Sequence, residues 1–379
     1  MNYLPGFHLI YHEKLLFNKN KKIMAFIKLY KDRLKHNYNF LNTLFEKEQI
    51  SWAIVTKILC GNELFLKEVL DLGMNEVCDS RLSNLKKIKK IRPDVQTIYI
   101  KPSPKNSVKT VVKYADASFN SESSTIRLLS EEAVRQKKIH KVIIMIELGD
   151  LREGIMGDDL IDFYEKVFKL PNIEIVAIGA NLNCLHGVLP SQDKLIQLSL
   201  YKQLIEASFD KKIRWVTGGT SVTLPLLFKR QVPKAVNHFR IGETLFFGNN
   251  LITNEAIKGM KTDVLRLYSE ILEITEKPKI PIGELAENPS GELFTVDESE
   301  YGKTSFRAII DVGFLDISPE YLIPDDLEIE VVNASSDMLI VDLGDTPRNY
   351  IVGGMISFKL KYMGVLRLLN SEYIEKKVE

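Results

Sequence analysis

KVIIMIELG, at residues 141–149, is followed after a longer polar stretch by IEIVAIGANL, at residues 173–182. Both runs are short, apolar and rich in β-branched residues, as strands are, and the segment between them has helical character. A strand, a helix and a second strand in this order form the unit of a parallel sheet. The stretch 141–182 therefore predicts an α/β fold.

The same rhythm extends from about residue 24 to residue 250. Helical segments lie between the apolar runs, for example at 63–73 and 121–138, and AFIKLY at 25–30 with the helical stretch after it precedes the repeating part. Eight runs is the number that a (β/α)8 barrel needs, so we predict a TIM-type barrel. The predicted strands are 51–57, 75–80, 95–100, 115–120, 141–149, 173–182, 213–219 and 238–242.

The alternation of strand-like and helical segments ends after residue 250. LEIEVVN, DMLIVDLGD and MISFKLKYMGVL read as strands joined by tight polar connections, and KPKIPIGELAENPSGEL (277–293) reads as a loop between two such strands. This pattern is typical of an antiparallel β domain. We therefore predict an N-terminal extension at 1–23, a barrel at 24–250 and a β domain at 251–379.

Composition excludes several classes of protein. The chain carries 51 Lys and Arg against 50 Asp and Glu, so no global basic field exists to hold nucleic acid. No run reaches about 18 uncharged apolar residues, the minimum for a membrane span, and the N-terminus does not read as a signal peptide. The cysteines form no CxxC pair, so neither a disulfide framework nor a metal site is indicated. We expect a soluble, cytoplasmic protein.

Functional groups of a (β/α)8 barrel lie where the strands end, at the C-terminal rim. The first predicted strand ends in Lys57, between the apolar runs Trp52 to Val55 and Ile58 to Leu59. Desolvation there would lower the pKa of the amine and make it available for imine formation. The alternative is a lysine whose stem packs while its head reaches water.

Three more rim windows carry candidate groups. The fifth reads ELGDLREG and places Arg152 at a strand end, where it can hold an oxyanion or form an ion pair with Glu153 or Asp150. The seventh reads TGGTS (217–221), and the eighth reads FRIGETLFFG (239–248). Their glycines and hydroxyls predict a phosphate site, which in this fold commonly lies after strands seven and eight.

A phosphate site opposite an imine-forming lysine is what pyridoxal 5'-phosphate requires. With this pattern the sequence resembles the alanine racemase superfamily of fold type III enzymes, most closely its ornithine racemase branch. The resemblance runs from about residue 24 to the end of the chain. It rests on AIVTKILCGN, ELGDLREGI, GANLNCLHGVLP, TGGTS, RIGE and the tail YMGVLRLLNSEYIEK.

The resemblance implies a role for each matching residue. Lys57 would bond the cofactor aldehyde and carry the proton on one face of the substrate, and Arg152 would bind the phenolate oxygen. Arg240 would face the pyridine nitrogen and, because a guanidinium keeps its proton, would weaken the ring as an electron sink. The remaining cofactor residues are Asn181, where alanine racemases have a histidine, and the phosphate cradle of Thr220, Ser221, Gly242 and Glu243.

Two positions depart from the alanine racemase pattern. Phe314 stands where those enzymes carry the tyrosine that acts as the opposite-face base from the partner subunit, and Gly61 replaces a tyrosine that helps to hold the phosphate. A two-base racemase then needs another group. We predict Asp316 as this catalytic residue, since it lies two residues beyond Phe314 and on the same side of a strand. The sequence also leaves open Cys184, His186, Tyr301 and Tyr373.

The resemblance implies a pyridoxal-phosphate-dependent amino-acid racemase that works as a homodimer, without a nucleic-acid or membrane partner. The substrate would be a small amino acid, with ornithine or another basic one suggested by the branch. Asp150, Glu153 and Asp316 are candidates to receive a side-chain ammonium. Two other functions stay open: a non-catalytic carrier of the cofactor, against which the β domain argues, and a lyase or decarboxylase on the same barrel, which Phe314 favours.

Overall fold

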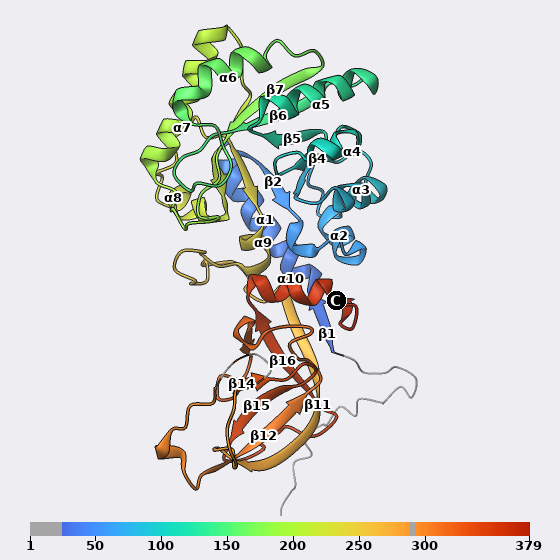
Figure 1. The fold of residues 1–379 in the computed structure, drawn as a ribbon, viewed down its shortest axis with the longest axis vertical. Coiled ribbons are helices and arrows are strands. Elements are labelled where there is room, and N and C mark those ends of the chain that lie inside the picture. Colours follow the sequence, from blue (N-terminus) through green and yellow to red (C-terminus); the bar gives the residue numbers. More distant parts are fainter. Residues whose placement is uncertain (1–24, 289–290, 292) are drawn as a thin grey trace, which may run out of the picture.

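The computed structural model describes residues 25–288, 291 and 293–379 and consists of two sheets with their helices. The expected N-terminal extension at 1–23 lies outside the described residues. Figure 1 shows a barrel domain above and a β domain below, with the chain passing from the lower domain into the barrel and back. The predicted order of a barrel followed by an antiparallel domain is confirmed.

The barrel sheet is parallel and runs β8-β7-β6-β5-β4-β3-β2-β10-β9, with Gly218 alone separating β8 from β9. The ring is therefore nearly closed, and every strand expected in this part of the chain is present. Its strands are β2 (Ser51–Val55), β3 (Glu76–Asp79), β4 (Gln96–Tyr99), β5 (Ala117–Asn120), β6 (His140–Met145), β7 (Ile173–Gly179), β8 (Trp215–Thr217), β9 (Gly219–Thr220) and β10 (His238–Ile241).

Helices connect the strands on the outside of the barrel and bury one face each. In α2, for example, Phe65, Leu66 and Val69 are fully buried, as the 3.6-residue period predicts. The helices of this domain are α1 (Lys31–Lys47), α2 (Glu63–Leu70), α3 (Leu82–Ile91), α4 (Val108–Tyr114), α5 (Ser123–Arg135), α6 (Leu160–Val167), α7 (Gln192–Phe209), α8 (Leu224–Phe228) and α9 (Glu243–Phe247).

The interior of the barrel is a packed core of its own. Phe119, Ile143 and Met145 are fully buried there and contact residues from the other strands. A filled interior leaves the rim as the place where a ligand can enter.

The second sheet is built mainly from the C-terminal part of the chain, in the order β13-β16-β11-β12-β15-β14. Neighbouring strands are antiparallel, as predicted, and the segment expected as a loop follows β11. The strands are β11 (Leu265–Pro278), β12 (Thr304–Ile310), β13 (Leu322–Pro324), β14 (Glu330–Ala334), β15 (Leu339–Gly344), β16 (Met355–Leu360) and β17 (Glu375–Val378).

Two segments differ from the sequence-based expectation. Strand β1 (Phe26–Leu29), expected to precede the barrel, pairs with β11 and β17 and so belongs to the second sheet. MISFKLKYMGVL is a strand only up to Leu360, after which α10 (Tyr362–Asn370) begins. Val365, Leu368 and Leu369 are buried in α10, so the apolar residues that suggested a continuing strand form a helix face instead.

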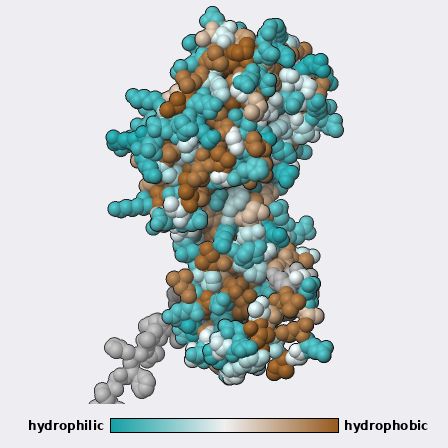
Figure 2. All heavy atoms as spheres, turned by 60° about the vertical axis from the view of Figure 1, so that its left-hand side comes forward, coloured by the Kyte–Doolittle hydropathy of each residue, from teal (hydrophilic) through white to brown (hydrophobic). Residues whose placement is uncertain are grey.

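The surface carries polar and apolar side chains in mixture (Figure 2). On the upper domain, apolar side chains gather on the side where α7 lies in Figure 1. They include Ile196, Leu200 and Leu204, which follow one another at four-residue spacing and are all exposed. Within the described ranges, the structure contains no helix with the length and apolar character needed to cross a membrane.

Candidate active site

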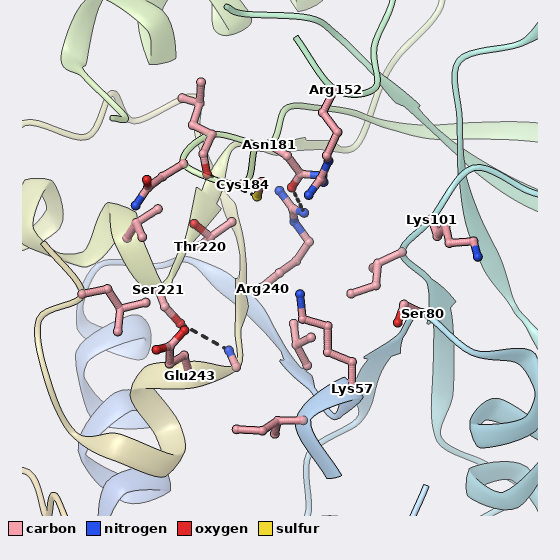
Figure 3. A pocket seen from close by; sticks show the side chains of 18 of the residues that line it. Lys57, Ser80, Lys101, Arg152, Asn181, Cys184, Thr220, Ser221, Arg240 and Glu243 are labelled. Atoms are coloured by element: carbon pink, nitrogen blue, oxygen red, sulfur yellow. Dashed lines mark hydrogen bonds between the residues drawn. The ribbon is translucent and has the colours of Figure 1, made fainter. Parts of the chain in front are cut away.

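A cavity of about 810 Å³ opens at the C-terminal ends of the barrel strands. It brings together side chains that are far apart in the sequence, and Figure 3 shows them extending into one space from different strands. Asp316 does not line it. The lining includes every expected cofactor residue, namely Lys57, Arg152, Asn181, Thr220, Ser221, Arg240, Gly242 and Glu243.

Lys57 begins η1 (Lys57–Leu59), two residues beyond the end of β2. Ile58 and Leu59 turn into the core, whereas the side chain of Lys57 is exposed in the cavity. The expectation of a desolvated lysine was therefore wrong for the protein alone, because the cavity around the amine is open. Its Nζ lies 6.0 Å from the ring centre of Tyr362, a cation–π distance.

Arg240 is held rigidly at the floor of the cavity. Its side chain is buried, Nε donates to Thr217 Oγ1 at 2.9 Å, and Nη2 donates to the carbonyl oxygens of Ala180 and Thr217. Nη1 donates to Asn181 Oδ1 at 2.7 Å. Burial lowers the pKa of Arg240, yet a guanidinium remains charged at neutral pH. A fixed positive charge thus faces the cavity.

Arg152 is the second guanidinium of the site. It forms a two-pronged ion pair with Glu153, and Nδ2 of Asn181 also donates to Glu153. This pairing with Glu153 raises the pKa of Arg152. The ion pair that the sequence left open is therefore present, and it links Arg152 through Asn181 to Arg240.

The loop that carries Arg152 is shaped by Glu147 and Gly154. The Glu147 carboxylate accepts hydrogen bonds from the backbone N–H groups of Gly149, Leu151 and Arg152. Gly154 has a φ of +149°, and a Cβ there would lie 2.2 Å from the backbone nitrogen of Glu147. Only glycine fits such a close approach, and the loop geometry depends on it.

The phosphate side of the cavity is formed by the seventh and eighth strand ends. Ser221 Oγ accepts from the backbone N–H groups of Gly242 at 3.3 Å and Thr244 at 3.4 Å, which ties the two loops together. Thr220 begins a capping box with Thr223. Burial raises the pKa of Glu243, with Lys57 acting in the opposite direction. Hydroxyls and backbone amides therefore converge where the glycine turns predicted an anion.

Asp150 does not face the cavity mouth, contrary to the expectation that it receives a substrate ammonium. It is 1% exposed, and its two oxygens accept backbone N–H groups. Burial raises the pKa of Asp150, but these hydrogen-bond donors bring it below its usual value. Because four donors already occupy the carboxylate, it serves to fix the loop after β7. The donors belong to Cys184, Leu185, His186 and Val188.

The candidates in the β domain lie away from this cavity. Asp316 is 8% exposed and accepts a hydrogen bond from Ser371 Oγ at 2.6 Å. Two further candidates lie in the barrel domain, in the loop after β7: Cys184 lines the cavity and His186 does not. Tyr301 and Tyr373 are exposed and do not line it either.

Gly61 is fixed by packing as well as by the turn. It has a φ of +71°, and a Cβ at this position would lie 2.3 Å from Oδ1 of Asn84. Asn84 in turn donates to the buried Asp79. The space that a tyrosine would need at Gly61 is therefore filled by Asn84.

Ser80, Lys101 and Tyr362 are among the lining residues that the sequence reasoning missed. Ser80 directly follows β3 and Lys101 lies two residues after β4, so the strand-end rule could have included them. Tyr362 comes from α10 of the other domain, and nothing local in the sequence places it beside Lys57.

This donor set fits pyridoxal phosphate. The ligand presents an aldehyde, a phenolate, a pyridine nitrogen and a phosphate. The cavity offers the Lys57 amine for the aldehyde, the guanidiniums of Arg152 and Arg240 for the oxygen and the nitrogen, and the Thr220 and Ser221 loop for the phosphate. A barrel with this rim defines an enzyme that binds pyridoxal phosphate.

Comparison with known proteins points to the same class, enzymes that bind pyridoxal phosphate. Residues 29–250 match the family model described as "Alanine racemase, N-terminal domain". The ornithine racemase of Acetoanaerobium sticklandii is 36% identical over 348 residues, which cover 92% of this chain and 97% of that protein. The lysine racemase of Thermotoga maritima is 29% identical over 325 residues, covering 86% and 90%.

Solved structures support the fold. Alanine racemase from Bartonella henselae with covalently bound pyridoxal phosphate superposes with a TM-score of 0.71 at 14% identity, covering 94% of this chain and all of that one. The enzyme from Streptomyces lavendulae gives a TM-score of 0.72 at 10% identity, covering 95% and 98%. The chain belongs to the alanine racemase family, and it is an amino-acid racemase whose cofactor is pyridoxal phosphate.

Proposed function

We propose that this racemase interconverts the L and D forms of a basic amino acid, ornithine or lysine. The observation that carries the substrate class is the similarity, over most of the chain, to one racemase of ornithine and one of lysine. Both amino acids end in a side-chain ammonium. The proposal therefore requires a negative group in the cavity to receive it.

Glu243 is the proposed partner of that ammonium. Two carboxylates line the cavity, and Glu153 is already paired with Arg152. For Glu243 no ion pair occurs among the residues that the structure describes. A cationic side chain that bonds Glu243 offsets the cost of burying its charge, so Glu243 would favour ornithine or lysine over alanine.

The cofactor roles of the individual residues remain part of the proposal. Lys57 would bond the cofactor and hold or release the Cα proton at Nζ on one face. Arg152 would bind the phenolate oxygen, and Arg240 would offer an N–H to the ring nitrogen. Asn181 would orient Arg240 directly and Arg152 through Glu153. Thr220, Ser221, Gly242 and Glu243 would hold the phosphate, the last two through their backbone amides. Bound pyridoxal phosphate supplies an electron sink for the pair left by the broken Cα–H bond.

The proposal includes a homodimer that works in the cytoplasm. The exposed apolar stripe of Ile196, Leu200 and Leu204 on α7 supports a self-association surface, because an apolar helix face gains free energy when another surface covers it. The three free cysteines are compatible with a reducing compartment. Light scattering after size exclusion tests the dimer, and a monomer at micromolar concentration would contradict it.

Incubation with single L-amino acids in heavy water, followed by chiral analysis, tests the reaction and the substrate together. Deuterium at Cα with inversion is expected, with kcat/KM for ornithine or lysine at least about 100-fold above that for alanine. Equal values for the three amino acids would refute the substrate class. A product that has lost carbon would indicate a lyase, and no exchange at all would indicate a carrier.

Glu243→Gln gives a sharper test of the ammonium site, since the variant keeps the backbone amide and the size of the side chain. The expected result is a KM for ornithine raised about tenfold or more, with little change for alanine. An unchanged KM for ornithine would remove Glu243 from the proposal.

A further inference from the structure

Racemisation through two groups needs a proton carrier on each face of the substrate. One group takes the Cα proton and leaves the electron pair of the broken bond behind. The other gives its proton to that pair from the opposite side, so a new Cα–H bond forms with inverted configuration. The two groups end with their protons exchanged and return to the starting state through solvent. Lys57 accounts for one of them, and the sequence has phenylalanine at the usual second position, Phe314.

We infer that Cys184 is the second acid–base group of this site, an inference that rests on the proposed racemase reaction. Cys184 lies in the loop after β7 and lines the same cavity as Lys57. Its thiol forms no disulfide and donates to the carbonyl oxygen of Leu182 at 3.4 Å, and its side chain is exposed. Figure 3 shows Cys184 and Lys57 reaching the cavity from different sides, with the Arg240 side chain between them.

Three of the other proton carriers that line the cavity, Glu153, Tyr362 and Glu243, are less suited to the second position. Glu153 is bound by Arg152 and Asn181. Tyr362 lies with its ring 6.0 Å from Lys57 Nζ, on the side of the cavity that Lys57 already occupies, and burial raises its pKa well above neutrality. Glu243 follows the phosphate loop that Ser221 ties together.

Two guanidiniums, those of Arg152 and Arg240, line the same cavity as Cys184. The negative charge of a Cys184 thiolate interacts with both Arg152 and Arg240, as it contributes to the pKa of each guanidinium. Cationic neighbours and partial exposure are the surroundings in which reactive cysteines are found. The other two thiols differ: burial raises the pKa of Cys60 to about 11, and Cys78 is fully buried.

The loop around Cys184 is held in place by Asp150. The Asp150 carboxylate accepts the N–H of Cys184 at 2.9 Å, and it accepts three further N–H groups from the same loop. An acid–base group must stay within hydrogen-bond reach of the reacting atom, and a loop fixed at four points meets that need. Asp150 is therefore a positioning residue for Cys184.

Cys184→Ser separates the second base from cofactor binding, because a hydroxyl keeps the shape of the side chain but is a poor base near neutral pH. The variant is expected to retain the visible absorbance of the lysine-bound cofactor and to racemise at least about 100-fold more slowly than the natural enzyme. One enantiomer should still exchange its Cα proton for solvent deuterium, without inversion, through Lys57. His186→Ala, in the same loop but outside the cavity lining, is the matched control and should stay within about threefold of the natural rate.

Alkylation with iodoacetamide, followed by peptide mass mapping, provides a readout that does not depend on turnover. Cys184 should react faster than Cys60 and Cys78, and added pyridoxal phosphate with substrate should slow its labelling. Near-natural racemisation by Cys184→Ser, or continued exchange of both enantiomers, would overturn the inference. If the natural enzyme itself fails to racemise any amino acid, the proposed function fails instead, so the two failures are distinguishable.

Discussion

Arg240 donates from Nε to Oγ1 of Thr217 at 2.9 Å, and both side chains are buried beneath the cavity. The same oxygen lies 2.8 Å from Nδ1 of His238, whose Nε2 lies 2.8 Å from Glu76. Because the Glu76 carboxylate only accepts, Nε2 of the neutral imidazole carries the ring proton, and Nδ1 then accepts from the Thr217 hydroxyl. A directed chain of hydrogen bonds thus supports the guanidinium from below.

Replacing Thr217 by Val should break this chain. A buried guanidinium N–H would lose its acceptor, which costs roughly 1–3 kcal/mol of unfolding free energy. Binding of pyridoxal phosphate should weaken as Arg240 moves. Urea unfolding and titration with the cofactor measure the two effects. Thr217→Ser keeps the hydroxyl and should behave like the natural protein; equal loss in both variants would show that the methyl group, rather than the hydrogen bond, matters.

Replacing Lys57 by Ala should abolish both racemisation and the visible absorbance of the lysine-bound cofactor, since no other residue is expected to form that bond. The absorbance is read after adding pyridoxal phosphate and removing the excess. Lys101→Ala is a matched control, because Lys101 lines the same cavity and should keep the absorbance. A Lys57→Ala variant that still shows the band would refute the assignment.

Gly61→Ala and Gly73→Ala separate packing from backbone strain. Both glycines have positive φ, +71° and +90°, but a Cβ at Gly61 lies 2.3 Å from Asn84, whereas nothing lies within 4 Å at Gly73. We expect a loss of about 1 kcal/mol at Gly73 and about 2–4 kcal/mol at Gly61, measured by urea unfolding. The added change Asn84→Ala should recover part of the loss at Gly61. Equal losses at the two sites would contradict the packing argument.

His140 should make the protein sensitive to acid. Desolvation lowers the pKa of this buried histidine to about 4, with Asp116 acting in the opposite direction. Above pH 6.5 the imidazole is neutral in both the folded and the unfolded protein, so its full contribution to the unfolding free energy is present. As the pH falls from 6.5 to 4, only the unfolded chain gains the proton, so the unfolding free energy decreases by roughly 3 kcal/mol.

Urea unfolding between pH 7 and pH 4 measures this slope. His140→Gln removes the titrating group and should lose less stability over the same range. The loss of unfolding free energy that His140→Gln itself causes is measured separately at pH 7, because His140 also forms a hydrogen bond with Ser118 at 2.8 Å. If the unfolding free energies of the two proteins fell in parallel with pH, His140 would bind its proton equally well in the folded and unfolded states.

Much of the barrel could be predicted because each strand is signalled locally. The runs that form β6 and β7 are apolar and β-branched, and the helical stretches between strands have a period that no strand shows. The rim position of Lys57 followed from the end of β2, and that of Arg152 from the end of β6. Strand β1 could not be assigned to its sheet, because FIKL carries no information on whether its partner is β2 or β11.

The sequence by itself determined the order of strands and helices, the change to antiparallel β structure, and the residues that the strand ends present at one rim, since these depend on local period and turn chemistry. Only the tertiary structure decided what each side chain touches there. Asp150 accepts hydrogen bonds from the loop of Cys184 instead of lining the cavity mouth, and Tyr362 of α10 lies beside Lys57. The reason is physical: the final partner of a charged or aromatic group depends on chain segments distant in sequence, and no local pattern encodes that approach.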